Sequence, residues 1–278
     1  MAHPDLTVVV PAGGRQEHLA RCLTSLRRST IQLEVIVVDL LADAGVVADG
    51  ADRVLPCRPH RSGALRIGEA RNIGAAAATS ERLCFLDVDC VVEPWAPERW
   101  LDALHAFDNA LLAPPVRYLR EGWSERLDTS DRVGTPAWVA ESDASNRPRP
   151  AVDTIATYAE YDLFWSLAFC CTTSTFDALG GFDSSFVGNG AEDTDFARRA
   201  RRRGTPFVWL AAGVAYHQYH PPTRLDPSHV GALVANASRF RRRWGTWPMR
   251  GWLDELAAQG LVEWDAAGDR LRPVAGRS

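Results

Sequence analysis

Apolar runs of strand length alternate with amphipathic stretches over the first half of the chain. Runs that are apolar at nearly every position are typical of strands buried on both faces of a sheet, whereas apolar residues every three or four positions indicate a helix. The alternation predicts a mainly parallel, nucleotide-binding type of sheet over roughly residues 5–118. The predicted elements are a strand at 7–11, a helix at 16–28, a strand at 34–39, a weaker strand at 53–57 and an Ala-rich helix at 68–79.

The stretch 82–92 is a short apolar run that ends in two carboxylates one residue apart, Asp87 and Asp89. Residues i and i+2 of an extended backbone point the same way, so the two side chains can converge on one object if the strand continues. Carboxylate oxygens suit Mg²⁺ or Mn²⁺. The alternative is a pair of solvated carboxylates in a turn.

Asp39 also stands at the C-terminal end of a predicted strand. In open α/β sheets ligands bind beyond the carboxyl ends of the strands, so we expect Asp39 on the same edge as Asp87 and Asp89. The first strand is not followed by G-x-G-x-x-G, so the dinucleotide-binding fingerprint is absent. The chain also has no P-loop motif.

The second half of the chain is less regular. Its pattern predicts a helix at 97–107, a strand at 110–119, a long polar loop or small lid at 120–150, an apolar cleft floor at 161–173 and a strand at 207–216. His217 follows the last of these strands, where a metal ligand is one interpretation and a structural histidine is the other.

Glycines flank a group of acidic residues at 180–196. Glu192, Asp193 and Asp195 open a predicted helix that runs to about residue 203. Acidic residues in a first helical turn also have a structural explanation, because they complement the positive end of the helix dipole. The glycines between 187 and 190 allow a loop that closes over a bound ligand.

The C-terminal part combines arginines and tryptophans at 239–247 with an amphipathic helix at 252–261. We expect a solvated arginine face with the tryptophans packed on the rest of the protein. Contact with anionic lipid, or with a carbohydrate acceptor, is the less favoured alternative.

The amino-acid composition makes some classes of function less suitable for this protein. The chain has 278 residues, a net charge of −4 and no lysine, so it shows no global basic footprint for nucleic acid and cannot use a catalytic lysine. The six cysteines show no C-x-x-C spacing, which indicates reduced core thiols in a cytoplasmic protein. The sequence shows no signal-peptide pattern and no apolar run long enough to span a membrane.

Taken together, four separated stretches resemble GT-A fold glycosyltransferases of family 2. They are residues 11–19, 87–89 and 192–195 together with His217. The segment 181–195 also resembles the C-terminal domain of β-1,4-galactosyltransferases. The resemblance covers roughly residues 5–220, and it implies a Rossmann-like α/β fold with a mainly parallel central sheet flanked by helices, followed by an extended C-terminal helical segment.

The resemblance implies a nucleotide-sugar donor, with UDP favoured, and a divalent metal, Mn²⁺ or Mg²⁺. Asp89 and Asp87 are the expected metal carboxylates, with Asp89 the more direct ligand, and His217 completes the metal shell. A planar guanidinium grips two oxygens at once, which suits Arg15 and Arg71 to diphosphate or base. The expected donor-binding residues are Pro11, Ala12, Arg15, Asp39, Arg71, Asp87 and Val88.

An acceptor hydroxyl must lose its proton as it attacks the sugar. Asp193 is the expected general base, with Glu192 orienting the acceptor, and a single displacement predicts inversion. The acceptor is expected to be a carbohydrate, a lipid-linked molecule or a small molecule. The expected domains are 1–220, with a donor half at 5–118 and an acceptor half at 119–220, and a C-terminal extension at 221–278. A non-catalytic nucleotide- or carbohydrate-binding module, or a sugar nucleotidyltransferase, is the alternative.

Overall fold

The computed structural model describes residues 3–42, 45–126, 142–143, 150–221 and 225–274. Most of the polar segment predicted at 120–150 therefore lies outside the described residues. The central feature is an eight-stranded sheet in the order β3-β2-β1-β4-β10-β6-β11-β9. Its first four strands are parallel and correspond to the predicted ones: β1 (Leu6–Ala12), β2 (Leu33–Asp39), β3 (Arg53–Pro56) and β4 (Arg82–Leu86).

The other half of the sheet mixes strand directions. Strand β10 (Ala168–Thr172) is antiparallel to both β4 and β6 (Leu111–Ala113). Strand β11 (Phe207–Trp209) is parallel to β6, and the short β9 (Thr154–Ile155) pairs antiparallel with β11 as the edge strand. A second sheet has the order β5-β12-β7-β8, made by β5 (Cys90–Val92), β12 (Ala215–His217), β7 (Val116–Leu119) and β8 (Ser142–Asp143).

Two of the predicted strands were wrong in extent, because each is divided between the two sheets. The predicted strand at 110–119 breaks at Pro114 and Pro115, which have no backbone N–H to donate to a ladder. The one at 207–216 breaks near Gly213, whose φ is 76° and whose carbonyl accepts a hydrogen bond from the Trp100 indole at 2.8 Å.

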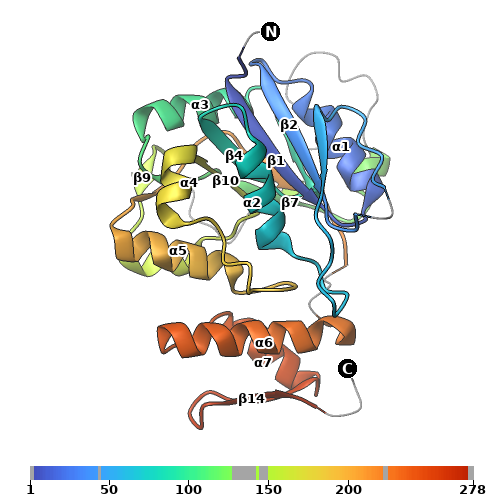
Figure 1. The fold of residues 1–278 in the computed structure, drawn as a ribbon, viewed down its shortest axis with the longest axis vertical. Coiled ribbons are helices and arrows are strands. Elements are labelled where there is room, and N and C mark those ends of the chain that lie inside the picture. Colours follow the sequence, from blue (N-terminus) through green and yellow to red (C-terminus); the bar gives the residue numbers. More distant parts are fainter. Residues whose placement is uncertain (1–2, 43–44, 127–141, 144–149, 222–224, 275–278) are drawn as a thin grey trace.

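Side-chain alternation along the strands produces one core on each face of the large sheet. Val8 and Val10 of β1 pack in the core formed with α1 (Gln16–Leu26) and α3 (Ala96–Ala106). Val9 packs in the opposite core with α2 (Ile67–Ala77), α4 (Thr173–Leu179) and α5 (Glu192–Arg203). Figure 1 shows these helices around the sheet. The six cysteines are buried and form no disulfide among the described residues, as predicted.

The C-terminal residues form a separate layer, drawn below the sheet in Figure 1. It consists of α6 (Pro227–Trp244), α7 (Arg250–Ala258) and the hairpin β13 (Val262–Asp265) and β14 (Arg270–Pro273). The predicted helix at 252–261 corresponds to α7, whereas α6 was not predicted. The layer has its own apolar core, including Leu233 and Leu253. Two short 3₁₀ helices complete the described elements, at Trp123–Arg126 and Tyr158–Leu163.

Candidate active site at the carboxyl edge of the sheet

Asp87 and Asp89 lie in a turn rather than in a continued strand. Strand β4 ends at Leu86, and the amide of Cys90 donates to the carbonyl of Asp87 at 2.9 Å. The strand therefore does not continue through these residues, which was the condition for the two side chains to point the same way. The turn directs the two carboxylates to different partners, and each becomes part of a separate group of charged side chains.

Asp89 lies between two histidines. Its Oδ1 is 3.5 Å from Nε2 of His217 and its Oδ2 is 3.3 Å from Nε2 of His220, while Arg15 also donates to Oδ2. Strand β12 carries His217 to this position, because it pairs with β5 and sets His217 opposite Cys90. The backbone continues this pairing, since the amide of Gln218 donates to the carbonyl of Asp89 at 2.6 Å.

Neighbouring positive groups keep Asp89 ionised, and burial keeps His217 neutral. Burial opposes the charged form of Asp89, but His217, His220 and Arg15 outweigh it and lower the pKa of Asp89 to about 2. Burial lowers the pKa of His217 below its ordinary value, although Asp89 acts in the opposite direction. A neutral imidazole and an ionised carboxylate are the protonation states that bind metals.

The group fits a divalent cation. The ligand atoms of Asp89, His217 and His220 all lie within 4.8 Å of one another, and Oδ1 of Asp89 is buried with no hydrogen-bond partner among the described residues. Nδ1 of His220 lies 2.8 Å from the carbonyl of Pro221, and the tautomer that donates to this oxygen has its Nε2 lone pair available for a metal. One carboxylate and two imidazoles are suitable ligands for Mn²⁺ and other first-row metals.

Arg71 is the centre of the second group. Its side chain, carried by α2, is only 2% exposed. Nη2 donates to Oδ1 of Asp87 at 2.9 Å, and Nη1 lies 3.8 Å from Oε1 of Glu192. Its guanidinium also lies over the Phe182 ring, 5.1 Å from the centroid. Asp87, predicted both as a metal ligand and as a donor contact, is thus directed at Arg71 here.

Burial, together with crowding of carboxylates, raises two pKa values in this group. Burial raises the pKa of Asp87; Arg71 opposes the rise and the charge of Asp89 adds to it. Burial and the neighbouring Asp193 raise the pKa of Glu192 to about 7, against the effect of Arg71. Because the charge of Asp89 acts on Asp87, the two groups are electrostatically linked through the turn.

Asp193 stands in the first turn of α5 and is partly exposed. Its Oδ1 accepts hydrogen bonds from the amide of Thr194 at 2.6 Å and from the Thr194 hydroxyl at 3.2 Å. Its charge also contributes to the raised pKa of Asp87. The structure therefore brings the acidic segment at the start of α5 to the same edge as the turn after β4.

The remaining predicted residues lie along the same edge. Ala12 is the register partner of Asp39, and Oδ1 of Asp39 accepts a hydrogen bond from the amide of Leu41 at 2.9 Å. Pro11 precedes Ala12 at the end of β1. The side chain of Val88 packs in the apolar core, so only its backbone faces this edge. His220 was not among the predicted metal ligands, although its position three residues after His217 could have indicated a second histidine ligand.

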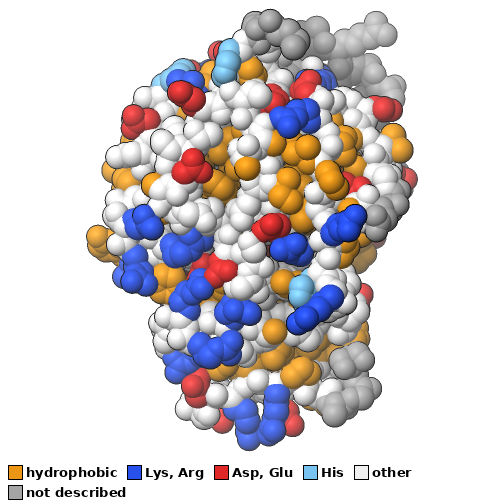
Figure 2. Space-filling view, viewed as in Figure 1, with side chains coloured by type: hydrophobic (Ala, Val, Ile, Leu, Met, Phe, Trp, Pro, Cys, Tyr) orange, Lys and Arg blue, Asp and Glu red, His pale blue; other side chains and the backbone are white. Residues whose placement is uncertain are grey.

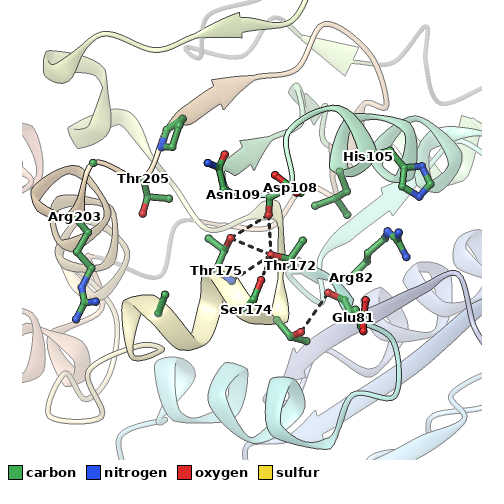
Figure 3. A pocket seen from close by; sticks show the side chains of 15 residues that line it. Glu81, Arg82, His105, Asp108, Asn109, Thr172, Ser174, Thr175, Arg203 and Thr205 are labelled. Carbon is green, nitrogen blue, oxygen red and sulfur yellow. Dashed lines mark hydrogen bonds between the residues drawn. The ribbon is translucent and has the colours of Figure 1, made fainter.

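A cavity of about 780 Å³ lies at the other edge of the sheet (Figure 3). Its lining includes Arg82 at the start of β4 and Thr172 at the end of β10, which pair with each other in antiparallel register. None of the predicted site residues lines it. The hydroxyls of Thr172 and Thr175 both donate to the carbonyl of Asp108.

Comparison with known proteins places the chain in a family. The family model described as "Glycosyltransferase like family 2" matches residues 29–246. Validoxylamine A glucosyltransferase of Streptomyces hygroscopicus subsp. jinggangensis is 26% identical over 260 residues, covering 86% of this chain and 61% of that protein. Pre-mycofactocin glycosyltransferase of Mycobacterium tuberculosis H37Rv is 31% identical over 238 residues, covering 80% and 44%. The chain thus spans about half of the length of these curated relatives.

Solved structures agree in fold. S. aureus TarS 1-349 aligns with a TM-score of 0.55 at 14% identity, covering 85% of this chain and 65% of that one. GalNAc-T7, solved with UDP, GalNAc and Mn²⁺, aligns with a TM-score of 0.56 at 16% identity, covering 92% and 57%. None of the helices within the described ranges is long and apolar enough to cross a membrane. On this evidence the chain belongs to glycosyltransferase-like family 2 and has the GT-A fold.

Proposed function

We propose that this protein is a metal-dependent, inverting glycosyltransferase that moves a hexose from a UDP-sugar to an acceptor hydroxyl. The observation that carries the proposal is the meeting of two groups at one edge of the sheet. Asp89 lies with His217 and His220 in a group suited to a cation, and the adjoining Asp87 links through Arg71 to Glu192, beside Asp193.

Asp89, His217 and His220 would hold the metal. A bound divalent cation would neutralise the negative charge that develops on the departing diphosphate. Arg15 already donates to Asp89 and is 29% exposed in its side chain, so its guanidinium is placed to share that charge. Asp87 was also predicted as a ligand; given its contact with Arg71, we assign it instead to the ribose or the donor sugar.

The donor nucleoside would lie along the ends of β1 and β2. Ala12 and Asp39 are neighbours there, and one oxygen of the Asp39 carboxylate is engaged by the amide of Leu41. The other oxygen is the proposed acceptor for base or ribose. Arg71 is too deeply buried for open contact with a base, so we assign it to holding Asp87 and Glu192.

Asp193 is the proposed general base. Its carboxylate would take the proton of the acceptor hydroxyl while the hydroxyl oxygen forms a bond to the anomeric carbon and the bond from that carbon to the diphosphate oxygen breaks. Its Oδ1 accepts hydrogen bonds from Thr194, and the side chain is partly exposed, as a base must be to reach its substrate. One displacement inverts the anomeric centre.

The names of the relatives guide the choice of substrates. Validoxylamine A glucosyltransferase and pre-mycofactocin glycosyltransferase are named for small molecules, and the first for glucosyl transfer. We therefore propose UDP-glucose as the first donor to test and a small-molecule hydroxyl as the first class of acceptor, ahead of lipid-linked or polymeric carbohydrate. Membrane contact is not part of the proposal.

A donor screen tests the function. Purified protein is mixed with UDP-, GDP- and dTDP-sugars, with Mn²⁺, Mg²⁺ or EDTA, and both the melting temperature and the release of free nucleoside diphosphate are measured. We expect UDP-sugars with Mn²⁺ to raise the melting temperature most and to be turned over, and EDTA to abolish both effects. Equal stabilisation without metal, or turnover of no donor, would contradict the proposal.

A further inference from the structure

The segment that leads into α5 lies against the C-terminal layer. Residues 183–195 include the loop at 187–190 and the first turn of α5, which carries Glu192 and Asp193. Side chains of α6 contact this segment at several points, although α6 follows it in the sequence by more than thirty residues. Figure 1 shows α6 running below α5 and the loop.

Asn236 of α6 holds the loop through three hydrogen bonds. Its side chain is 2% exposed. Nδ2 donates to the carbonyls of Val187 at 3.0 Å and Asn189 at 3.4 Å, and Oδ1 accepts from the amide of Val187 at 3.3 Å. Among the described residues this buried amide finds its hydrogen-bond partners in the loop, which ties the loop backbone to one position on α6.

Asp195, inside the first turns of α5, is held by the end of α6. It is fully buried, and its Oδ1 accepts from Nη1 of Arg243 at 2.8 Å and from the indole of Trp244 at 2.9 Å. Nη2 of Arg243 donates to Asp183 at 2.5 Å. One guanidinium therefore joins the start of the segment to the helix at its end. These contacts agree with the predicted packing of tryptophan on the rest of the protein.

The loop glycines fit closely against the same layer. Gly188 has a φ of 76°, and a Cβ built on it would lie 2.8 Å from Cβ of Ala232 in α6. Gly190 has a φ of 102°, and its Cβ would lie 2.9 Å from Sδ of Met249, just before α7. The glycines thus permit close approach of the C-terminal layer, which favours a held loop over one that closes freely.

We infer that Asn236, Arg243 and Trp244 of the C-terminal layer are positioning residues that place Glu192 and Asp193 for glycosyl transfer. None of the three belongs to the donor or metal groups, so they act through the loop and Asp195. This inference rests on the proposed role of Asp193. A displacement of about 1 Å in a reacting group can lower a rate by roughly 10²-fold, so small changes at α6 have measurable effects on turnover.

Matched variants test the inference. Asn236→Ala removes the loop contacts, and Trp244→Phe removes one N–H donor to Asp195 while keeping an aromatic ring. Arg242→Ala is the control, because Arg242 is an exposed neighbour in the same last turn of α6. For each protein we would measure hydrogen exchange of residues 186–195, the dissociation constant of UDP with Mn²⁺, and kcat with UDP-glucose.

We expect Asn236→Ala and Trp244→Phe to exchange faster at 186–195 and to lose about tenfold or more in kcat, with UDP binding changed by less than about twofold. Arg243→Lys should recover part of the kcat lost in Arg243→Ala, since a lysine keeps the charge but not both hydrogen bonds. Arg242→Ala should match the wild type in all three measurements.

The inference is overturned if Asn236→Ala and Trp244→Phe match Arg242→Ala in exchange and in kcat. It is also overturned if they lose UDP binding and kcat equally, because that pattern indicates general damage to the fold. If the wild type turns over no donor at all, the proposed function fails, while the exchange measurement still decides whether α6 holds the segment.

Discussion

Nη2 of Arg71 lies 2.9 Å from Oδ1 of Asp87, and the guanidinium that makes this contact is almost entirely buried. A cation in that position is shielded from water, so it is stabilised by Asp87 on one side and by Glu192 on the other to the extent that these carboxylates are ionised. The pair therefore joins the turn after β4 to the start of α5.

Removing the Arg71 guanidinium should be costly for stability. Arg71→Gln leaves the buried Glu192 and the partly exposed Asp87 without their cation, and we expect a loss of about 3–5 kcal/mol in the free energy of unfolding. Urea denaturation at neutral pH without metal measures it. The control is Arg66→Gln, which breaks a more exposed pair with Glu69 and should cost less than about 1 kcal/mol. Equal losses in the two variants would show that the buried pair has no special role.

The histidines should be needed for metal binding. We expect His217→Ala and His220→Ala each to weaken Mn²⁺ binding by at least about tenfold, since each removes a nitrogen ligand from a group of three. Calorimetric titration of Mn²⁺ into the protein without nucleotide measures this. His105→Ala, at an exposed position on α3, is the control and should bind Mn²⁺ like the wild type. Unchanged affinity in His220→Ala would remove His220 from the metal site.

Loss of the proposed base should affect catalysis but not binding. Asp193→Asn keeps the size of the side chain and removes its basicity, so we expect kcat to fall by about 10²–10⁴-fold. The dissociation constant of UDP with Mn²⁺ should change little. Steady-state kinetics and calorimetry measure the two quantities, and turnover close to the wild-type rate would refute the assignment of Asp193.

The raised pKa of Glu192 predicts a pH dependence of stability. Its ordinary value is 4.5, and in the folded protein it is about 7. Below pH 4.5 the group is protonated in both states, and between the two values only the unfolded state loses the proton, so stability falls as pH rises. The wild type should therefore lose roughly 3 kcal/mol relative to Glu192→Gln between pH 4 and pH 8.

Urea denaturation of both proteins at several pH values, without metal, provides the comparison for Glu192. The difference between wild type and Glu192→Gln should grow with rising pH and level off above pH 7. A difference that is constant with pH would mean that Glu192 titrates normally.

Two glycines in helices should respond to alanine in opposite directions. A Cβ at Gly74 in α2 would lie 2.2 Å from Cγ1 of Val9 in β1, so Gly74→Ala should destabilise the protein by about 1–3 kcal/mol. A Cβ at Gly231 in α6 would have no atom of another described element within 4 Å, so Gly231→Ala should stabilise the protein by up to about 1 kcal/mol. Thermal melts of the two variants would contradict this if both moved the same way.

Local patterns in the sequence predicted most of the first half of the fold. Strands β1, β2 and β4 and helices α1, α2 and α3 lie close to where apolar periodicity placed them, because a buried strand or an amphipathic helix leaves its period in the residues. The strand predicted at 110–119 was wrong because it ran through Pro114 and Pro115, and the one at 207–216 because nothing in its apolar run says which of two sheets each half joins. Helix α6 was missed although Val230, Leu233, Val234 and Ala237 repeat at helical spacing.

For the candidate site, the sequence likewise predicted the residue types but not their contacts. Its residue types were visible at the ends of predicted strands and at the start of α5. The contact partners were not, because Asp89 meets His217 and His220 through pairing of β5 with β12 across more than a hundred residues. The turn at 87–89 also separates two carboxylates that an extended backbone would have directed together.

The sequence by itself determined the alternating elements, the family resemblance and the kinds of side chain available for chemistry, because these depend on composition and on spacing along a few turns or a single strand. Tertiary structure alone decided that Arg71 bridges Asp87 and Glu192, that His220 joins Asp89, and that Asn236 and Arg243 of the C-terminal layer hold the segment before and within α5. Such contacts join residues that are far apart in the chain, and burial affects the protonation states of the residues that make them. The contacts therefore exist only once the sheets and the C-terminal layer have packed.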